Sequence, residues 1–477
     1  MKSRYILCAL LTACLLQSCE KSLQETPKTV ISPDEFFKNP SSYESAVTGI
    51  YADFPLYVVY THEMITDLYA TPSASAEQAL PIYNNQPTPD YYNAGGAWNT
   101  PYAVIKNANF ILQYLPNAPL DDSKKAQLIA EASFLRGYAF FNLVQLFGDV
   151  PLPLKIPQDY NSLRLPRTGQ AQVYEQVLKD LLYAEQNLPD KAAQQGRVDK
   201  NVATALLARV YLTMAGNPLK QTQYYKDALQ KSTAVINSGK YKLMDDYAQV
   251  FHNTKYTSES IWEKLYEPGR GSNFLNGSSN TSPGYNPTLV PSNNFMASFS
   301  KGDRRFSWGI ISNYIKPDKK VLDRPFFQKF VDTVSINRGD LPSQASIPYT
   351  VPIIRLAEMY LIAAEAENAI NGPANAYSYI NAIRKRARMD KNDPTQVPDL
   401  SGLSKEQFQQ AVWREFDWEL HEEGQSWTIM KRTNTFDRIQ KQRGASLNVP
   451  VGPYNQTWLI PTTEVTNNNI PQNPLYK

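Results

Sequence analysis

The hydrophobic residues between Asp121 and Leu146 repeat at a spacing of three and four residues, which is the period of one face of an α-helix. The apolar positions of this stripe are Leu128, Ala132, Leu135, Ala139, Leu143 and Leu146. We expect the helix to end at Gly148, because Pro151 and Pro153 cannot continue it. A chain in which this period recurs must bury helix faces against one another, so the pattern predicts a mostly α fold.

The same period predicts further helices along the chain. They span residues 32–52, 99–115, 170–187, 201–215, 224–238, 354–370, 373–388 and 404–423. Several stand as adjacent pairs with short links, as in tetratricopeptide repeats, where each helix pair stacks on the next. The strict consensus of that repeat is absent. We therefore expect a degenerate, tetratricopeptide-like scaffold, mainly over residues 99–240 and 353–425.

Two long segments lack a helical period and are rich in Pro, Ser, Asn, Tyr and Gly. They are residues 69–98 and 247–350, and we expect them to form the irregular, ligand-binding part of the protein, with a short strand at Ser260–Glu263. The chain from Trp458 to Lys477 is polar and rich in Asn and Pro, which predicts an extended end.

The N-terminus is typical of a bacterial lipoprotein signal. Lys2 and Arg4 precede an apolar run that ends in the lipobox-like sequence Leu16-Gln17-Ser18-Cys19. We predict a signal peptide over residues 1–18, acylation of Cys19, and a flexible lipidated tether over residues 19–31. An ordinary secretory signal, in which the cysteine is incidental, is the alternative.

Removal of this signal would leave Cys19 as the sole cysteine, so no disulfide could form within one mature chain. A large hydrophobic core must then hold the exported protein. The signal also removes Lys2 and Arg4, which leaves 46 basic against 45 acidic residues. This balance argues against a nucleic-acid binder.

The sequence carries no recognisable catalytic motif, such as a nucleophile elbow, a phosphate-binding loop or a histidine metal motif. His421-Glu422-Glu423 is expected to lie on a solvated helix face, and Glu415 and Glu419 to be surface charges. Asp303-Arg304-Arg305 favours a structural turn. Carboxylates that pair only in space leave a surface glycoside hydrolase open as a third hypothesis, and a purely structural envelope protein is also possible.

Several blocks, in the same order along the chain, resemble the SusD/RagB family of outer-membrane nutrient-binding lipoproteins. The strongest is Ala130–Leu152, with the sequence AEASFLRGYAFFNLVQLFGDVPL. The others are Val173–Pro189, Gly196–Leu212, Arg355–Ala366, Ile380–Arg384 and the closing segment Trp458–Pro461 with Glu464 and Gln472–Pro474. One block departs from the family pattern, because Phe416 and Asp417 replace an arginine pair; we expect a buried charge network there to be altered.

The resemblance implies a single SusD-like domain over residues 32–477, anchored to the outer membrane through the lipid on Cys19 and facing the exterior. It implies a SusC-like TonB-dependent transporter as partner and a captured glycan as ligand, with no catalysis, no cofactor, no metal and no nucleic acid. The alternative keeps the fold and the partner but makes the ligand a peptide or another nutrient.

Carbohydrate binding needs flat aromatic faces for the C–H side of a sugar ring and amide or charged groups for its hydroxyls. Two loop clusters offer both. The candidate ligand-binding residues are Tyr83, Tyr91, Tyr92 and Trp98 in the first, and Arg270, Asn273, Tyr285, Trp308 and Tyr314 in the second. For each aromatic residue the alternative is that the ring packs against its own scaffold. Trp262, Trp413, Trp418, Trp427 and Trp458 are expected in the core.

Overall fold

The structure is a computed structural model of the chain. It describes residues 32–52, 65–70, 94–157, 159, 161–251, 256–265, 290–312, 314–315, 321–322, 325–330, 351–443, 451–452 and 456–474. Helices dominate this part of the chain and the strands are few and short, so the predicted mostly α fold is confirmed.

The N-terminal half of the chain carries seven of the described helices. They are α2 (Pro33–Phe36), α3 (Pro40–Ala52), α6 (Ala94–Tyr114), α7 (Asp122–Phe147), α8 (Gln170–Asn187), α9 (Lys200–Ala215) and α10 (Tyr224–Asn237). The later helices are α12 (Asn293–Ser298), α13 (Arg304–Gly309), α15 (Leu356–Asn371), α16 (Pro373–Ala387), α17 (Lys405–Leu420), α18 (Ser426–Thr433), α19 (Asp437–Arg443) and α20 (Thr462–Asn467).

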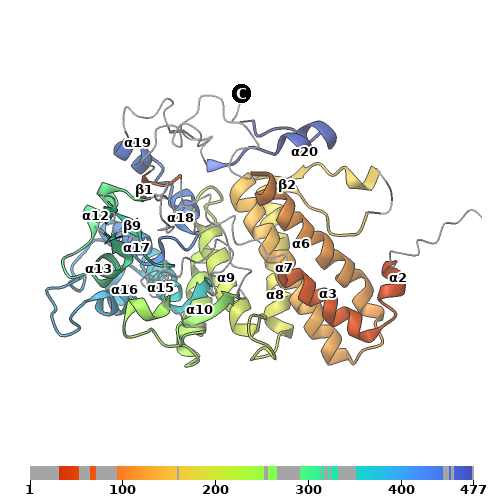
Figure 1. Cartoon of the computed structure of the whole chain (residues 1–477), viewed down its shortest axis with the longest axis horizontal. Coiled ribbons are helices and arrows are strands. Elements are labelled where there is room, and N and C mark those ends of the chain that lie inside the picture. The colour runs from red at the N-terminus through yellow and green to blue at the C-terminus, as the bar shows by residue number, and fades with distance from the viewer. Residues whose placement is uncertain are drawn as a thin grey trace, which may run out of the picture.

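Successive helices pack against one another in a continuous series. Helix α7 contacts α6 and α8, α9 contacts α8 and α10, and α15 packs against α10, α16 and α17. In Figure 1 the helices α3, α6, α7 and α8 lie together on one side of the molecule, and α12, α13, α16 and α17 lie on the other. The second side carries the short helices α12 and α13, of 6 residues each, and we call it the short-helix side; the first side carries the long helices α6 and α7.

In the described part of the chain, the strands form five small sheets of two antiparallel strands each. The pairs are β1 (Tyr69–Ala70) with β5 (Val290–Pro291), β2 (Val150–Pro151) with β3 (Arg167–Thr168), β4 (Ser260–Lys264) with β10 (Val351–Arg355), β6 (Ile310–Ile311) with β9 (Phe326–Phe327), and β7 (Tyr314–Ile315) with β8 (Val321–Leu322). The predicted strand at Ser260–Glu263 is therefore correct. Its partner β10 leads directly into α15.

Three sequence predictions differ from the structure. The helix predicted over residues 32–52 is interrupted, because the Asn39 side chain accepts a hydrogen bond from the Ser41 N–H at 3.1 Å and Pro40 begins a new helix. Helix α6 begins at Ala94 rather than at Asn99. The C-terminal end is not fully extended, since it contains α20.

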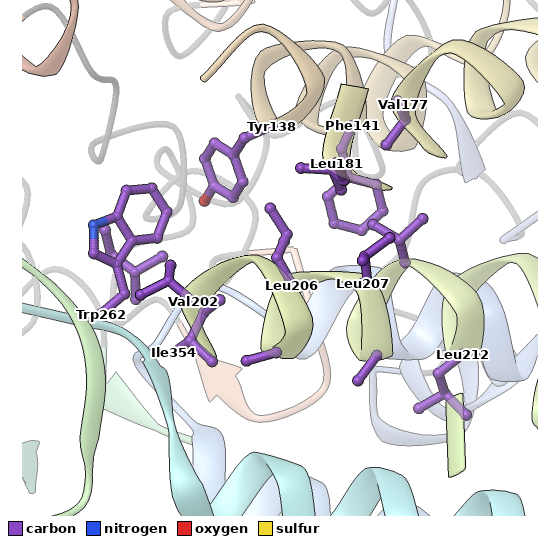
Figure 2. Packing of buried hydrophobic residues seen from close by; sticks show 14 of the residues in the cluster. Tyr138, Phe141, Val177, Leu181, Val202, Leu206, Leu207, Leu212, Trp262 and Ile354 are labelled. Atoms are coloured by element: carbon purple, nitrogen blue, oxygen red, sulfur yellow. The ribbon is translucent and has the colours of Figure 1, made fainter. Parts of the chain in front are cut away.

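One hydrophobic core runs through the helix series, and Figure 2 shows part of it. Tyr138 and Phe141 of α7 and Val177 and Leu181 of α8 point toward Leu206 and Leu207 of α9 in that view. Trp262, which the sequence placed in the core, is 3% exposed and meets Phe134 edge-on with ring centroids 5.2 Å apart. Trp418, Trp427 and Trp458 are also buried, as predicted.

Helices α7 and α8 approach closely at Gly137. A Cβ atom at this position would lie 3.1 Å from the Asp180 Cβ and 3.3 Å from two side-chain atoms of Leu181, so a larger residue would push the helices apart. The neighbouring Arg136 donates to both carboxylate oxygens of Asp180, at 2.9 and 2.7 Å. The close packing at Gly137 and the bidentate ion pair between Arg136 and Asp180 therefore hold α7 and α8 together.

No helix in the described part of the chain combines the length and the hydrophobicity that are needed to cross a membrane.

Leu181 and Leu182 are consecutive leucines of α8 with the same helix propensity but different burial. Comparing the two therefore isolates the contribution of core packing to stability. Leu181 is fully buried and Leu182 is 41% exposed. We expect Leu181→Ala to lower the free energy of unfolding by about 2–5 kcal/mol, and Leu182→Ala by less than about 1 kcal/mol. Urea unfolding followed by far-ultraviolet circular dichroism measures both, and equal losses would contradict the packing assigned to α8.

Candidate functional site

The interior of the short-helix side holds a cluster of ten charged residues, which we call the arginine–glutamate cluster. Five carboxylates meet five cations, and every one of these residues is less than 10% exposed. The members are Glu259, Asp303, Glu415, Glu419 and Glu423, with Arg305, Lys329, Arg355, Arg384 and Arg386. The formal charges balance, which is what a buried cluster needs.

Glu419 is the centre of the cluster. Its carboxylate accepts hydrogen bonds from Arg355 and Arg386, and Arg305 donates to it at 3.2 Å. Burial alone would raise the pKa of Glu419, but the charges of these three arginines outweigh burial and hold the pKa well below its usual value. The three arginines therefore favour the ionised form of Glu419 at neutral pH.

Glu423 extends the cluster beyond the end of α17. Arg355 donates to its two carboxylate oxygens at 2.7 and 2.8 Å, and Lys329 donates at 2.9 Å. Burial opposes ionisation of Glu423, and the two cations again lower its pKa below the usual value. Because Arg355 ends β10 and Lys329 follows β9, these contacts tie the region after α17 to two strands.

The structure overturns the prediction of a solvated charged face in this region. Glu415 and Glu419 are fully buried, His421 is fully buried, and Glu423 is 9% exposed. The carboxylates do not repel one another, because arginines from α13, α16 and β10 lie between them. Asp303-Arg304-Arg305, in contrast, is structural as predicted: Asp303 caps α13 and pairs with Arg305.

The position that departs from the family pattern is also charged and buried. Asp417 is 2% exposed and accepts a hydrogen bond from Arg438 of α19 at 2.6 Å, and Arg438 also pairs with Asp67 at 2.9 Å. Phe416 lies beneath the Arg432 guanidinium, 4.9 Å from its ring centroid. The residues that replace the arginine pair thus make their own contacts with α18 and α19.

The arginine–glutamate cluster is a structural joint, because its charged groups are buried and pair with one another. Among the described residues, no group of three or more His, Cys, Asp or Glu side chains is suited to hold a metal ion. A small cavity nearby, lined by Arg209, Gln425 and Arg432 among others, has a volume of about 60 Å³. Such a space accommodates a few water molecules and is too small for a sugar.

Removal of one charge tests the cluster. Glu419→Gln keeps the side-chain shape but leaves three arginines with one negative charge fewer, so we expect the free energy of unfolding to fall by about 3–5 kcal/mol at pH 7. Urea unfolding measures the loss. Glu406→Gln, at an exposed position in the first turn of the same helix, is the control, and it should cost less than about 1 kcal/mol.

The difference between Glu419→Gln and the unsubstituted protein should also depend on pH. Because the folded-state pKa of Glu419 is depressed, its stabilisation is fully present above the ordinary glutamate pKa of about 4.3 and declines as the pH falls below that value. The two proteins should therefore converge in acid. A constant difference from pH 7 to pH 3 would contradict the assignment.

A larger open space than the small cavity near the cluster lies along α6, on the other side of the molecule from α13, α16 and α17 (Figure 1), and we call it the Trp98 groove. Its volume is about 650 Å³. One wall is a single face of α6, whose lining residues recur at helical spacing: Trp98, Asn99, Tyr102, Ala103, Lys106, Asn109 and Phe110. The opposite face of α6, which carries Val104, Ile105, Ala108 and Ile111, is buried in the core.

The second wall is formed by the segment that connects β2 to β3. Its lining residues are Pro151, Pro153, Lys155, Ile156, Pro157, Ser162, Leu163 and Leu165. The prolines exclude a regular helix here. Two hydrogen bonds hold this wall to α6: the Tyr102 hydroxyl donates to the Pro151 carbonyl at 2.8 Å, and the Asn109 amide donates to the Pro153 carbonyl at 2.9 Å.

The C-terminal segment closes one end of the groove. Glu464, Asn468 and Ile470, in and just after α20, line this end, and the Asn468 amide donates to the Glu464 carboxylate at 2.6 Å. The segment is anchored because the Trp458 N–H donates to the Leu146 carbonyl at 2.7 Å. Burial and the Glu464 charge raise the pKa of Tyr102 well above its usual value, so its hydroxyl stays a hydrogen-bond donor.

Among the sequence-predicted ligand residues that the structure describes, Trp98 is the one that lines this groove. It is 2% exposed, meets Phe147 edge-on at 5.0 Å and lies against Tyr102, also at 5.0 Å, so most of the ring packs on the scaffold. Trp308 is 9% exposed and stacks on Phe251 at 6.2 Å in the other half of the molecule. The structure does not bring these two tryptophans together.

For the remaining candidate residues no side-chain contact is described. Tyr314 begins β7, of which the structure gives the backbone pairing with β8. Tyr83, Tyr91, Tyr92, Arg270, Asn273 and Tyr285 lie outside the described residues, as does Cys19. These residues stay predictions.

Sequence reasoning missed most of the Trp98 groove. Tyr102, Lys106 and Asn109 follow one another at helical spacing and make an aromatic and polar stripe on a helix whose other face is apolar. The spaced prolines Pro151, Pro153 and Pro157 indicate an extended wall nearby. Nothing in the sequence brings α20 to the same place.

Two family models match this chain, one over each half. Residues 27–212 match a family described as starch-binding and associating with the outer membrane, and residues 204–476 match the SusD family. The second match covers more than half of the chain, so the chain belongs to the SusD family. The resemblance found in its sequence blocks is thereby confirmed.

Individual relatives resemble the chain over nearly its whole length. A SusD-like protein of Formosa agariphila is 26% identical over 95% of this chain and 94% of its own. The structure of a SusD superfamily protein from Parabacteroides distasonis has a TM-score of 0.79 at 24% identity, and covers 91% of this chain and 98% of its own. A laminarin-binding SusD-like protein has a TM-score of 0.73 at 23% identity, with coverages of 91% and 99%.

Proposed function

We propose that the protein captures a glycan outside the cell, without cleaving it, and delivers it to a SusC-like TonB-dependent transporter in the outer membrane. The observation that carries the proposal is the Trp98 groove, in which aromatic rings and amides line one open space in a chain of the SusD family. Membership of this family supports carbohydrate binding and association with the outer membrane.

The groove has the chemistry that a sugar chain needs. Tyr102, Phe110 and the proline-rich wall supply apolar area for the C–H faces of the rings, and the exposed Asn99 supplies an amide for hydroxyls. The volume of about 650 Å³ lies within the usual range for ligand sites. Trp98 to Phe110 spans about 18 Å along the helix axis, which accommodates more than one sugar ring.

The acidic groups in the groove favour capture over hydrolysis. Glycoside hydrolysis ordinarily requires two carboxyl groups placed about 5–10 Å apart across the scissile bond. Among the described residues that line the Trp98 groove, Glu464 is the only one with a carboxylate. This supports a binding role, in agreement with the naming of one fold relative as laminarin-binding.

The loop residues that the sequence singled out extend the proposal. Tyr91 and Tyr92 stand immediately before α6 in the sequence, and Trp98 in its first turns lines the groove. We propose that Tyr83, Tyr91 and Tyr92 contribute further ligand contacts beside this helix. Arg270, Asn273, Tyr285 and Tyr314 remain proposed contacts of the second loop cluster.

Filling the groove tests where the ligand binds. Ala103→Trp places a large ring on the α6 wall without removing an existing contact, so we expect the retardation of the soluble protein in affinity gels with its cognate polysaccharide to fall at least about tenfold. Gln113→Trp is the matched control, since Gln113 is exposed on the same helix and does not line the groove.

The chain from Ser22 onward is the protein for this experiment, run against plant, host and microbial polysaccharides. Equal binding by both variants, with unfolding midpoints like that of the unsubstituted protein, would refute the groove as the site. Retention of peptides in place of glycans would favour the alternative ligand, and release of a shortened glycan would refute a non-catalytic role.

We propose that acylated Cys19 anchors the mature protein to the outer membrane, as its lipobox-like sequence indicates. In cells grown with labelled palmitate we expect label in the native protein and none in Cys19→Ala, which should leave the membrane fraction. Ser18→Ala keeps a small residue before the cysteine and should stay labelled. Label in Cys19→Ala would contradict the anchor, and protection from protease added to intact cells would contradict surface exposure.

A further inference from the structure

The Trp98 groove carries an excess of positive charge that its glycan-binding role does not require. Lys106 lies on the α6 wall and Lys155 on the opposite wall, both exposed, so ammonium groups stand on both sides of the space. The single carboxylate, Glu464, lies at the end of the groove that α20 forms. A ligand chain that follows α6 therefore passes between two cations.

Neither lysine has a partner among the described residues, in contrast to many basic side chains of this protein. Arg136 pairs with Asp180 and Arg209 with Glu358, while no ion pair or hydrogen bond occupies Lys106 or Lys155. Lys106 stands one helical turn after Tyr102 and Ala103, in the middle of the α6 wall. A free cation in the middle of a binding wall is available to a ligand.

Glu464 does not neutralise this pair. Its carboxylate accepts a hydrogen bond from Asn468 at 2.6 Å, and it stands in the first turn of α20, where the helix N-terminus favours negative charge. Its negative charge is thus already stabilised within the C-terminal segment. The two lysines are left to face the open space.

We propose that the Trp98 groove selects anionic glycans, whose carboxylate or sulfate groups pair with Lys106 and Lys155 while the ring faces lie on Tyr102 and Phe110. This inference rests on the proposed glycan-binding function and names the chemical class of its ligand. Uronates and sulfate esters supply the same negative charge to an ammonium group, which binds as a point charge. Neutral polysaccharides lose that contribution.

Matched ligands test the charge directly. Affinity gels would compare polygalacturonate with its fully methyl-esterified form, and a sulfated galactan with the same polymer after desulfation. We expect each acidic polymer to retard the protein more than its neutral counterpart, and the preference to shrink as salt rises from low to high concentration. A larger preference for polygalacturonate over its methyl ester identifies the carboxylate as the recognised group, and a larger preference for the sulfated galactan identifies the sulfate.

Matched variants assign the effect to the groove. The double variant Lys106→Gln/Lys155→Gln should weaken binding of the acidic polymer roughly 2- to 30-fold, and should weaken binding of the neutral form by a smaller factor. Glu464→Gln should strengthen acidic binding. Lys385→Gln removes the same charge from an exposed position of α16 outside the groove and should change nothing.

The outcomes separate the two proposals. Equal retardation by acidic and neutral forms, or acidic binding that survives both the lysine double variant and Ala103→Trp, would overturn the anionic preference and leave glycan capture standing. Failure of every glycan, acidic or neutral, to retard the protein would overturn both. A larger weakening of acidic than of neutral binding in the double variant supports the inference.

Discussion

The carboxylate of Glu419 is the point on which the short-helix side of the molecule depends. It meets arginines from β10, α16 and α13, three elements that lie far apart in the chain. Desolvating so many charges is expensive, and only near-complete pairing makes the arrangement tolerable. Charge-assisted hydrogen bonds are directional and allow one geometry, whereas an apolar core would allow several packings of short helices. The cluster therefore fixes how this side joins the long-helix scaffold.

Sequence reasoning succeeded where structure is local. The helix at Gln170–Asn187 was predicted to the residue, because hydrophobic period and helix ends are both local signals. It failed at Glu415 and Glu419, whose one-turn spacing is the same whether solvent or arginine surrounds them. Their partners lie up to 114 residues away, and a single sequence does not show which distant charges meet. The hydrogen bond that Asn39 accepts at the start of α3 was also missed, although Asn-Pro is a local helix-start signal.

The same difference between local and long-range signals explains which groove residues could be predicted from the sequence. Trp98 was selected because it is an aromatic residue at the edge of a loop, and it does line the groove, although most of its ring packs on Phe147 and Tyr102. Lys106 and Lys155 were not selected, since one is a polar residue inside a helix and the other stands in a proline-rich link. Their significance depends on the two hydrogen bonds that bring the link against α6.

The two faces of helix α6 have different roles: one contributes to stability, and the other lines the groove that is proposed to set specificity. One face carries Val104, Ile105, Ala108 and Ile111 into the core, where a change of even one methylene is costly. The other face carries the groove residues, of which Asn99 and Lys106 are exposed. Exposed side chains without partners contribute little to folding, so their identity is free to follow the ligand. On the proposal that this groove selects the charge of a glycan, substitution at Lys106 or Lys155 would change that selection, while the core behind the groove and the distant arginine–glutamate cluster stay as they are.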